Sequence, residues 1–446
     1  MLTIIAFFFA IGLLVFVHEY GHYWVAKRCG VGVLTFSIGF GKPIYQWQRG
    51  ETTWQIAMIP LGGFVRMMDE TEAPIADSAK QKAFNNKHPL QKIAVVLAGP
   101  LANLLFAVVA VSICYLVGVK TLKAEIATVQ PASIAYKAGV VAGDQVISVG
   151  GRPIDSWDQL QVELFDYAGA QTVALELRNK TGNTRSVELP LGAVSADKFD
   201  QHLLSRLGLS PFYSRTILAA VQTGGAAAKA GLQVGDTIVA VNQLPVKTWA
   251  EIQAAVLASN GRSISIEVER KGQMQQFNVT PIVELVDGVQ VPRLGIAPEA
   301  DRFKNQAQQL TIELSPVAAV QMGVKKTYQM AVLTLRMFGK MLIGVLSPKQ
   351  VSGPIGIAEY AGQSASLGWL AYLQFLALIS ISLGVLNLLP VPILDGGHLL
   401  YHSYELLTGK LVPASVTEWL QKIGLTLLLM LMALALFNDT SRLLLG

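Results

Sequence analysis

The chain has 446 residues, of which 52% are hydrophobic and only 15% are charged, and its formal net charge is +5. Ordinary soluble domains carry about 25% charged residues, so this composition predicts an integral membrane protein with a soluble part, not a single soluble core. The small net charge does not indicate nucleic-acid binding, and the two cysteines, Cys29 and Cys114, cannot form a disulfide framework or a cysteine zinc site.

The first apolar segment covers residues 2–26 and contains two histidines and Glu19. No Lys or Arg precedes it and no small-residue cleavage pattern ends it, so it is interpreted as a retained transmembrane helix and not as a signal peptide. Lys27 and Arg28 follow at once, and cationic flanks favour the cytoplasm. This helix is therefore expected to run from outside to inside.

Residues 27–92 hold nine Lys and Arg against five Asp and Glu, which predicts a cytoplasmic loop. Within the loop, residues 53–67 mix polar, apolar and β-branched side chains around a turn-like segment at 60–63, which predicts a β-hairpin or a pair of short strands. Residues 93–119 carry no charge and are long enough to return across a hydrocarbon core of ~30 Å. Asn103 is unusual there, and its amide is suited to a hydrogen bond between helices.

Residues 120–300 regain charge and contain an internal repeat. Lys137-Ala138-Gly139 recurs as Lys229-Ala230-Gly231, and the Gly-Asp pair at 143–144 recurs at 235–236, in both cases 92 residues later. Each unit is expected to contain a short helix, a Gly-Asp turn, a strand, a second turn and a helix that follows a tryptophan.

The C-terminal part is expected to add two more spans, at residues 367–390 and 416–437. Residues 327–346 are apolar at helical spacing but include Arg336 and Lys340. A further span is one reading of this segment, and an amphipathic helix on the outer surface is the favoured one. Four spans place both termini outside.

The segment His18-Glu19-Tyr20-Gly21-His22 carries the strongest chemical signal. Residues four apart lie on one face of a helix, so the two histidines can bind one metal ion, with Glu19 beside them to act on a metal-bound water. Zinc lowers the pKa of such a water toward ~7. A charged side chain deep in a bilayer costs about 2.5 kcal/mol or more, which favours a functional site over a polar helix-packing cluster.

A catalytic zinc usually has three protein ligands, and Asp395 is the best candidate for the third. It follows the third predicted span, where Pro390 and Pro392 prevent a regular helix. His18 lies roughly 25 Å along the first helix, and the first and third spans run in the same direction. Both ends are therefore expected to meet near the cytoplasmic face; a helix cap or turn at that surface is the alternative reading of Asp395.

Together these residues resemble the site-2 protease family of intramembrane zinc metalloproteases over nearly the whole chain. The motifs that carry the resemblance are Phe36-Ser37-Ile38-Gly39-Phe40-Gly41, Ile59-Pro60-Leu61-Gly62-Gly63, Ala83-Phe84-Asn85-Asn86-Lys87, Ala98-Gly99-Pro100, Ser352-Gly353-Pro354-Ile355, Leu389-Pro390 through Gly397, and Ala435-Leu436-Phe437-Asn438-Asp439.

The resemblance implies that His18, His22 and Asp395 hold Zn²⁺ and that Glu19 is the general base. It implies that Asn387 helps to position the substrate backbone; a hydrogen bond between helices is the alternative role. Strands within residues 56–68 would form a membrane-associated β-region that pairs with an unwound substrate.

The 92-residue repeat resembles tandem PDZ domains, expected in the periplasm at residues 121–205 and 206–300. The expected fold is thus a polytopic α-helical membrane protein with four transmembrane helices, a membrane-associated β-region and two α+β PDZ domains. The protease core would comprise residues 1–120 and 367–446, with an interfacial region at 301–366. In the family, PDZ domains act as a size filter that keeps bulky ectodomains from the membrane core.

The activity implied is cleavage of single-span membrane proteins within the inner membrane of a Gram-negative bacterium, after an earlier protease has trimmed the ectodomain. An anti-sigma-E factor of the envelope stress response is the expected substrate, with remnant signal peptides as a further class; the other partner is membrane lipid. Two alternatives remain open. A non-catalytic membrane PDZ scaffold or chaperone predicts no stoichiometric zinc, and a membrane-anchored zinc protease acting on soluble proteins predicts aqueous exposure around residues 18 and 22.

Overall fold

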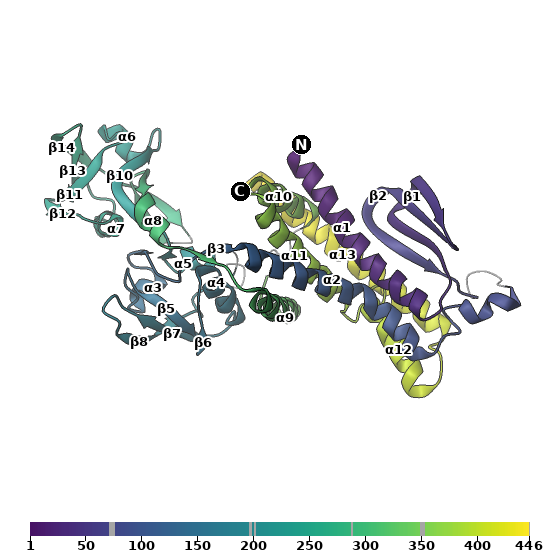
Figure 1. Ribbon diagram of the computed structural model, residues 1–446. Coiled ribbons are helices and arrows are strands. Elements are labelled where there is room, and N and C mark those ends of the chain that lie inside the picture. Colours follow the sequence, from purple (N-terminus) through teal and green to yellow (C-terminus); the bar gives the residue numbers. More distant parts are fainter. Residues whose placement is uncertain (71–75, 196–198, 200–201, 287–288, 348–352, 446) are drawn as a thin grey trace. The chain divides into compact units, whose positions relative to one another are not determined.

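The computed structural model describes residues 1–70, 76–195, 199, 202–286, 289–347 and 353–445 (Figure 1). Ser352, the first residue of one family motif, lies outside the described residues. The chain forms two compact units. Met1–Val119 and Glu313–Gly446 make up the first, called here the helical unit, and Lys120–Ile312 makes up the second, called the repeat unit.

Four described helices of the helical unit are long and apolar enough to cross a membrane, which confirms a multi-pass membrane protein. They are α1 (Leu2–Arg28), α2 (Pro89–Val117), α11 (Trp369–Asn387) and α13 (Ala414–Leu445). Helix α2 contacts both α1 and α11 (Figure 1). Small residues permit this approach: a Cβ added to Gly21 of α1 would lie 2.8 Å from Cβ of Ala102 on α2.

Helix α2 begins four residues before the predicted start of the second span. His88 caps the helix by accepting a hydrogen bond from the backbone N–H of Leu90, and Pro89 occupies the first turn. The prediction excluded Lys92 from the span because of its charge. In the structure Lys92 is 2% exposed and forms an ion pair of 2.8 Å with Glu405 of α12 (Asp395–Thr408), so its charge is compensated inside the fold.

The predicted hairpin is instead part of a sheet formed by two long, bent strands, β1 (Val33–Arg49) and β2 (Thr52–Met67). Residues 35–38 of β1 pair with two segments of β2, residues 53–56 and 63–66. These two segments therefore flank a strand from β1 and do not pair with each other. The aromatic ring of Phe36, 1% exposed, stacks on Trp54 and contacts Tyr23, which fixes the sheet against α1.

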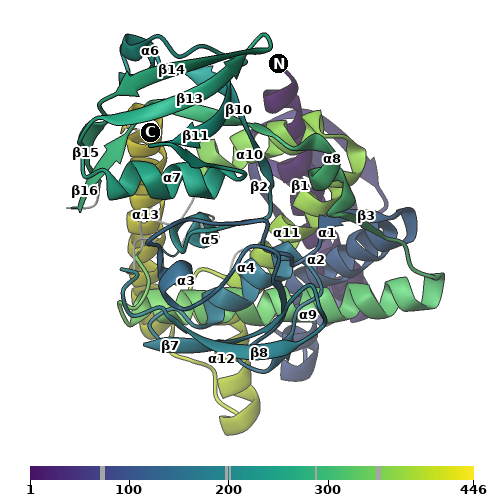
Figure 2. The same ribbon diagram turned by 90° about the vertical axis from the view of Figure 1, so that its left-hand side faces the viewer.

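Helix α9 (Pro316–Leu342) covers most of the segment that was read as either a span or a surface helix. It is not among the described helices that are apolar enough to cross a membrane. Figure 1 shows α9 nearly end-on while α2 runs along its length, and Figure 2 shows α9 lengthwise, so the two helices cross at a steep angle. This crossing favours a helix that lies along the membrane surface if α2 spans it.

Helix α10 (Pro354–Ser366) joins the two chain ends of the helical unit. A Cβ added to Gly362 of α10 would lie 2.8 Å from Cβ of Thr3, at the start of α1. Asp439, near the end of α13, accepts hydrogen bonds of 3.0 and 2.9 Å from the backbone N–H groups of Gly353 and Gly356. The first turn of α1 and the last turns of α13 therefore meet at one end of this unit, as an even number of spans requires.

In the repeat unit, the 92-residue offset extends to whole elements. The first copy contains α3 (Ile134–Lys137), β5 (Gln145–Val149), β6 (Arg152–Pro153), α4 (Trp157–Asp166), β7 (Thr172–Arg178) and β8 (Thr184–Pro190). The second contains α6 (Ala226–Ala230), β11 (Thr237–Val241), β12 (Leu244–Pro245), α7 (Trp249–Ala258), β13 (Ile264–Arg270) and β14 (Gln273–Val279). The offset ends at the last hairpin, which is three residues shorter in the second copy.

The Gly-Asp turns have a structural role in both copies. Asp236 is 1% exposed and accepts hydrogen bonds from Arg270 and from the backbone N–H of Gln233. Asp144 likewise binds Arg185. Burial alone would raise the pKa of Asp236, but the bonds from Arg270 and Gln233 hold that pKa below its usual value.

Candidate metal centre

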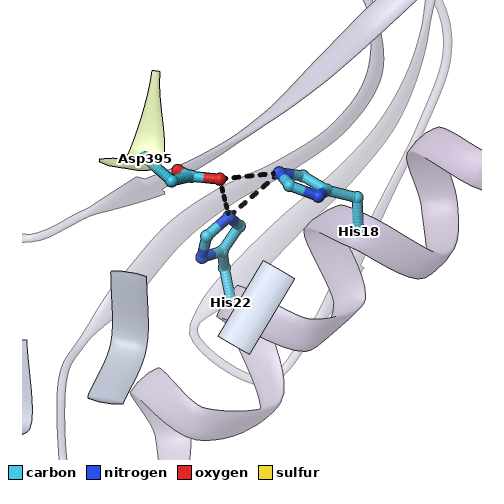
Figure 3. Close-up of side chains that lie close together, drawn as sticks. All are labelled: His18, His22 and Asp395. Atoms are coloured by element: carbon cyan, nitrogen blue, oxygen red, sulfur yellow. Dashed lines mark hydrogen bonds and ion pairs between the residues drawn. The ribbon is translucent and has the colours of Figure 1, made fainter. Parts of the chain in front are cut away.

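Helix α1 positions two imidazoles on one face, one turn apart. The Nε2 atoms of His18 and His22 lie 3.2 Å from each other, and both point toward Asp395 (Figure 3). Both rings are largely shielded, with 13% of the His18 side chain and 11% of the His22 side chain exposed. The helical spacing of the motif thus produces a pair of converging ring nitrogens, as the sequence predicted.

Asp395 reaches the same point from the first residue of α12, after the irregular segment that follows α11. Its Oδ2 atom lies 3.1 Å from Nε2 of His18 and 3.5 Å from Nε2 of His22. Burial alone would raise the pKa of Asp395, but the two imidazoles hold it well below its usual value. The carboxylate is therefore ionised, which is the state that binds a metal.

The two glycines after Asp395 allow the segment to fold tightly enough. A Cβ on Gly396 would lie 2.5 Å from the carbonyl oxygen of Leu388, and a Cβ on Gly397 would lie 2.5 Å from Cα of Pro392. Only glycine permits the backbone to approach itself this closely. The prolines end the regular helix of α11, and the glycines return the chain so that Asp395 faces α1.

The geometry of the three groups fits a tetrahedral zinc ion. Zinc bonds to His nitrogen and Asp oxygen are about 2.0–2.1 Å long, which places neighbouring ligand atoms of a tetrahedron about 3.3 Å apart. The three observed separations, 3.1, 3.2 and 3.5 Å, agree with this value. In addition, Oδ2 of Asp395 is buried, and its only polar contacts among the described residues are those with the two ring nitrogens, so a cation bound between the three atoms would satisfy it.

Residues of helix α2 contact the outer ring nitrogen, Nδ1, of both histidines. The Nδ1 atom of His22 lies 2.8 Å from the carbonyl oxygen of Val95, and Nδ1 of His18 lies 3.3 Å from the side-chain amide of Asn103. Gly99, between them, leaves room for His22, because its added Cβ would lie 2.7 Å from two ring carbons and closer still to Nε2. The sequence singled out Asn103 as unusual for a membrane helix, but it did not connect Asn103 with the metal centre.

Glu19 lies between the histidine pair and the sheet of β1 and β2, called here the β-region. It is 9% exposed and close enough to His18, His22 and Asp395 for their charges to interact. A Cβ added to Gly63 of β2 would lie 2.9 Å from Cγ of Glu19, so this strand passes directly against the glutamate. Asn387 is half-buried at the last residue of α11, eight residues before Asp395, and its contribution to substrate binding remains a prediction.

A second polar cluster, formed by Lys92, His402 and Glu405, connects α12 to α2. Glu405 binds Lys92 of α2 and lies 3.3 Å from Nδ1 of His402. Burial lowers the pKa of His402, so this ring is neutral near pH 7. Because α12 begins with Asp395, the Lys92–Glu405 ion pair also ties a metal-centre residue to α2.

The comparisons with known proteins agree with this site. Residues 6–431 match the family model described as peptidase family M50. A Neisseria meningitidis protein named as a zinc metalloprotease is 41% identical over the full length of both chains. Regulator of sigma-E protease RseP from Escherichia coli is 38% identical, and regulator of sigma E protease from Salmonella typhi is 39% identical, each over 98% of both chains. The chain thus belongs to peptidase family M50, the site-2 protease family of zinc-dependent metalloproteases.

Proposed function

We propose that this protease cuts peptide bonds inside the transmembrane segment of single-span membrane proteins, with His18, His22 and Asp395 as its zinc ligands. The observation that carries the proposal is the convergence of three ligand atoms from α1 and α12, elements joined by apolar helices. A zinc protease acting on soluble chains has no need of a site surrounded by such helices.

Zinc, when bound, supplies Lewis acidity that activates a water molecule and polarises the scissile carbonyl. Glu19 accepts the proton of the attacking water and later delivers it to the leaving amine. Because Glu19 has low exposure, bulk water does not compete with the attacking water for its carboxylate. His18, His22 and Asp395 stay fixed during these steps, because α2 and the turn at Gly396 hold them.

The β-region provides a place for an unwound substrate. Among the described residues, segment 63–66 pairs with a strand on one side only, and Gly63 in it contacts Glu19. A substrate that adds as a strand to this free edge recovers the hydrogen bonds lost from its own helix. The same pairing brings its backbone next to the general base, and Asn387 would bind that backbone from α11.

The exposed side chains of β1 suit a membrane-embedded position of this sheet. Phe40, Ile44 and Tyr45 are 44%, 70% and 62% exposed. Clustered apolar side chains of this size are unfavourable in water and favourable against lipid. We therefore place the β-region in the membrane near the cytoplasmic face, with the metal centre beside it.

We assign the repeat unit to two PDZ domains, at residues 121–205 and 206–300, on the periplasmic side of the inner membrane. The matching strand and helix order of the two copies supports the assignment. The proposed substrate is an anti-sigma-E factor, supported by relatives named as regulators of sigma-E protease, with remnant signal peptides as a further class. The PDZ pair would exclude substrates that still carry a bulky ectodomain.

The direct test is cleavage of a single-span substrate with a shortened ectodomain by the purified full chain in liposomes. Glu19→Gln should abolish cleavage within the membrane segment and retain zinc, because glutamine accepts no proton. Glu418→Gln, the same change at an exposed position of α13, is the matched control and should cleave normally. Equal cleavage by wild type and Glu19→Gln would refute the role of Glu19; cleavage only of soluble proteins would refute the intramembrane substrate.

A further inference from the structure

The two candidate zinc histidines differ in the group that meets their outer ring nitrogen. Both rings turn Nε2 toward Asp395 and toward each other (Figure 3), and Nδ1 of each ring meets a residue of α2. For His22 the partner is a backbone carbonyl, that of Val95, at 2.8 Å. For His18 it is the side chain of Asn103, at 3.3 Å.

Metal binding fixes the tautomer that each ring must adopt. A neutral imidazole that binds zinc through Nε2 carries its proton on Nδ1, so Nδ1 must donate a hydrogen bond. The Val95 carbonyl can only accept, and it satisfies His22. At His18 the polar atom in contact with Nδ1 is the amide nitrogen Nδ2 of Asn103, which donates only. Zinc ligation by His18 therefore requires the amide oxygen Oδ1 of Asn103, and not Nδ2, to face Nδ1 of His18.

The amide oxygen of Asn103 is available for this bond. Oδ1 is buried and has no hydrogen-bond partner among the described residues. A half-turn about the Cβ–Cγ bond exchanges Oδ1 with Nδ2 and presents an acceptor to Nδ1 of His18. This rotation moves only the side chain. The backbone carbonyl of Asn103 accepts a 2.8 Å hydrogen bond from Oγ of Ser380 on α11, which holds this turn of α2 in place.

We propose that Asn103 is a positioning residue of the metal centre: its amide oxygen accepts the Nδ1 proton of His18 and so keeps His18 in the tautomer and orientation that bind zinc. Asn103 does not touch the substrate or the metal. The proposal rests on the proposed ligand set and adds a reason for a fully buried amide, 0% exposed, inside an apolar helix. Partners of this kind typically change metal affinity by 10–100-fold.

The test measures zinc affinity of the full chain in detergent by competition with a chelator, together with the visible absorption spectrum of the Co²⁺-substituted protein. Asn103→Leu removes the acceptor at similar volume and should weaken zinc binding about 10–100-fold and alter the Co²⁺ spectrum. Asn103→Asp keeps an acceptor oxygen and should stay within a few-fold of wild type with an unchanged spectrum. Asn103→Ala serves if the leucine variant fails to fold.

Ser112→Ala is the matched control, because Ser112 is a buried polar residue of the same helix whose hydroxyl bonds to Val108 and not to the metal centre. It should bind zinc as the wild type does. Wild-type affinity in Asn103→Leu or Asn103→Ala would overturn the inference, and so would equal weakening in Asn103→Asp, since that result indicates a steric role. Absence of stoichiometric zinc from the wild type would instead overturn the ligand set itself.

Discussion

Gly99→Ala is the smallest change expected to disable the metal centre. The new methyl group would lie 2.7 Å from Cδ2 and Cε1 of His22 and closer still to Nε2, whereas ordinary contacts begin at 3.4 Å. The ring must therefore retreat by at least about 0.7 Å. Zinc–ligand distances lie within about 0.2 Å of their standard values, and a misplacement near 1 Å costs roughly 100-fold in rate. We expect loss of stoichiometric zinc and a fall in cleavage of about that size.

The control for this prediction is Gly12→Ala, the same substitution on α1. An added Cβ there meets no atom within 4 Å, so zinc content and cleavage should not change. The assay is metal analysis after dialysis, combined with cleavage of a truncated single-span substrate and thermal unfolding of the same samples. Wild-type zinc content and cleavage in Gly99→Ala would refute the steric argument. Loss of zinc with wild-type thermal unfolding would separate a local effect from general misfolding.

Three further predictions concern other groups. Asp395→Ala should lose stoichiometric zinc in metal analysis while the helical circular dichroism stays unchanged; retained zinc would remove Asp395 from the ligand set. Lys92→Met leaves Glu405 without its cationic partner, with only the neutral ring of His402 beside it, and should destabilise the helical unit by about 3–5 kcal/mol in chemical unfolding, whereas the double change Lys92→Met with Glu405→Leu should recover most of that loss. The lowered pKa of Asp236 predicts a stabilising contribution that is present above about pH 4 and lost as pH falls through its folded value, so amide exchange in β11 and β13, corrected for intrinsic rates, should accelerate there in wild type but change much less in Asp236→Asn.

The helices and the convergence of His18, His22 and Asp395 are the parts of this structure that the sequence predicts best. A transmembrane helix satisfies its own backbone, so composition alone locates it. Two of the three converging side chains lie one helical turn apart and need no long-range information. The third, Asp395, is predictable because the direction of each span determines which helix ends share a membrane face.

The start of α2 and the β-region show where local patterns are insufficient. The charge of Lys92 indicates the end of a span, yet the residue is buried because Glu405, 313 positions later, neutralises it. The β-propensity of residues 53–67 identifies two strand segments but not their neighbours. Residues 35–38 pair between the two segments, and in this position the ring of Phe36 packs against both Tyr23 of α1 and Trp54, contacts that are distant in the sequence.

Asn103 is predictable in one respect and not in another: the sequence shows that it needs a polar partner but does not identify that partner. Its presence in an apolar helix already requires a polar partner, because an unpaired amide in hydrocarbon costs several kcal/mol. The sequence cannot say whether that partner is another helix backbone or a functional side chain, since the answer depends on how α1 rotates against α2. Gly21 allows α1 to approach the α2 backbone closely, and in the resulting packing Val95 and Asn103 lie against the outer nitrogens of His22 and His18. Gly21 thus allows the helices to pack, whereas Gly99 leaves room for the His22 ring, which is why a single methyl group at residue 99 is expected to act on zinc binding before it acts on the fold.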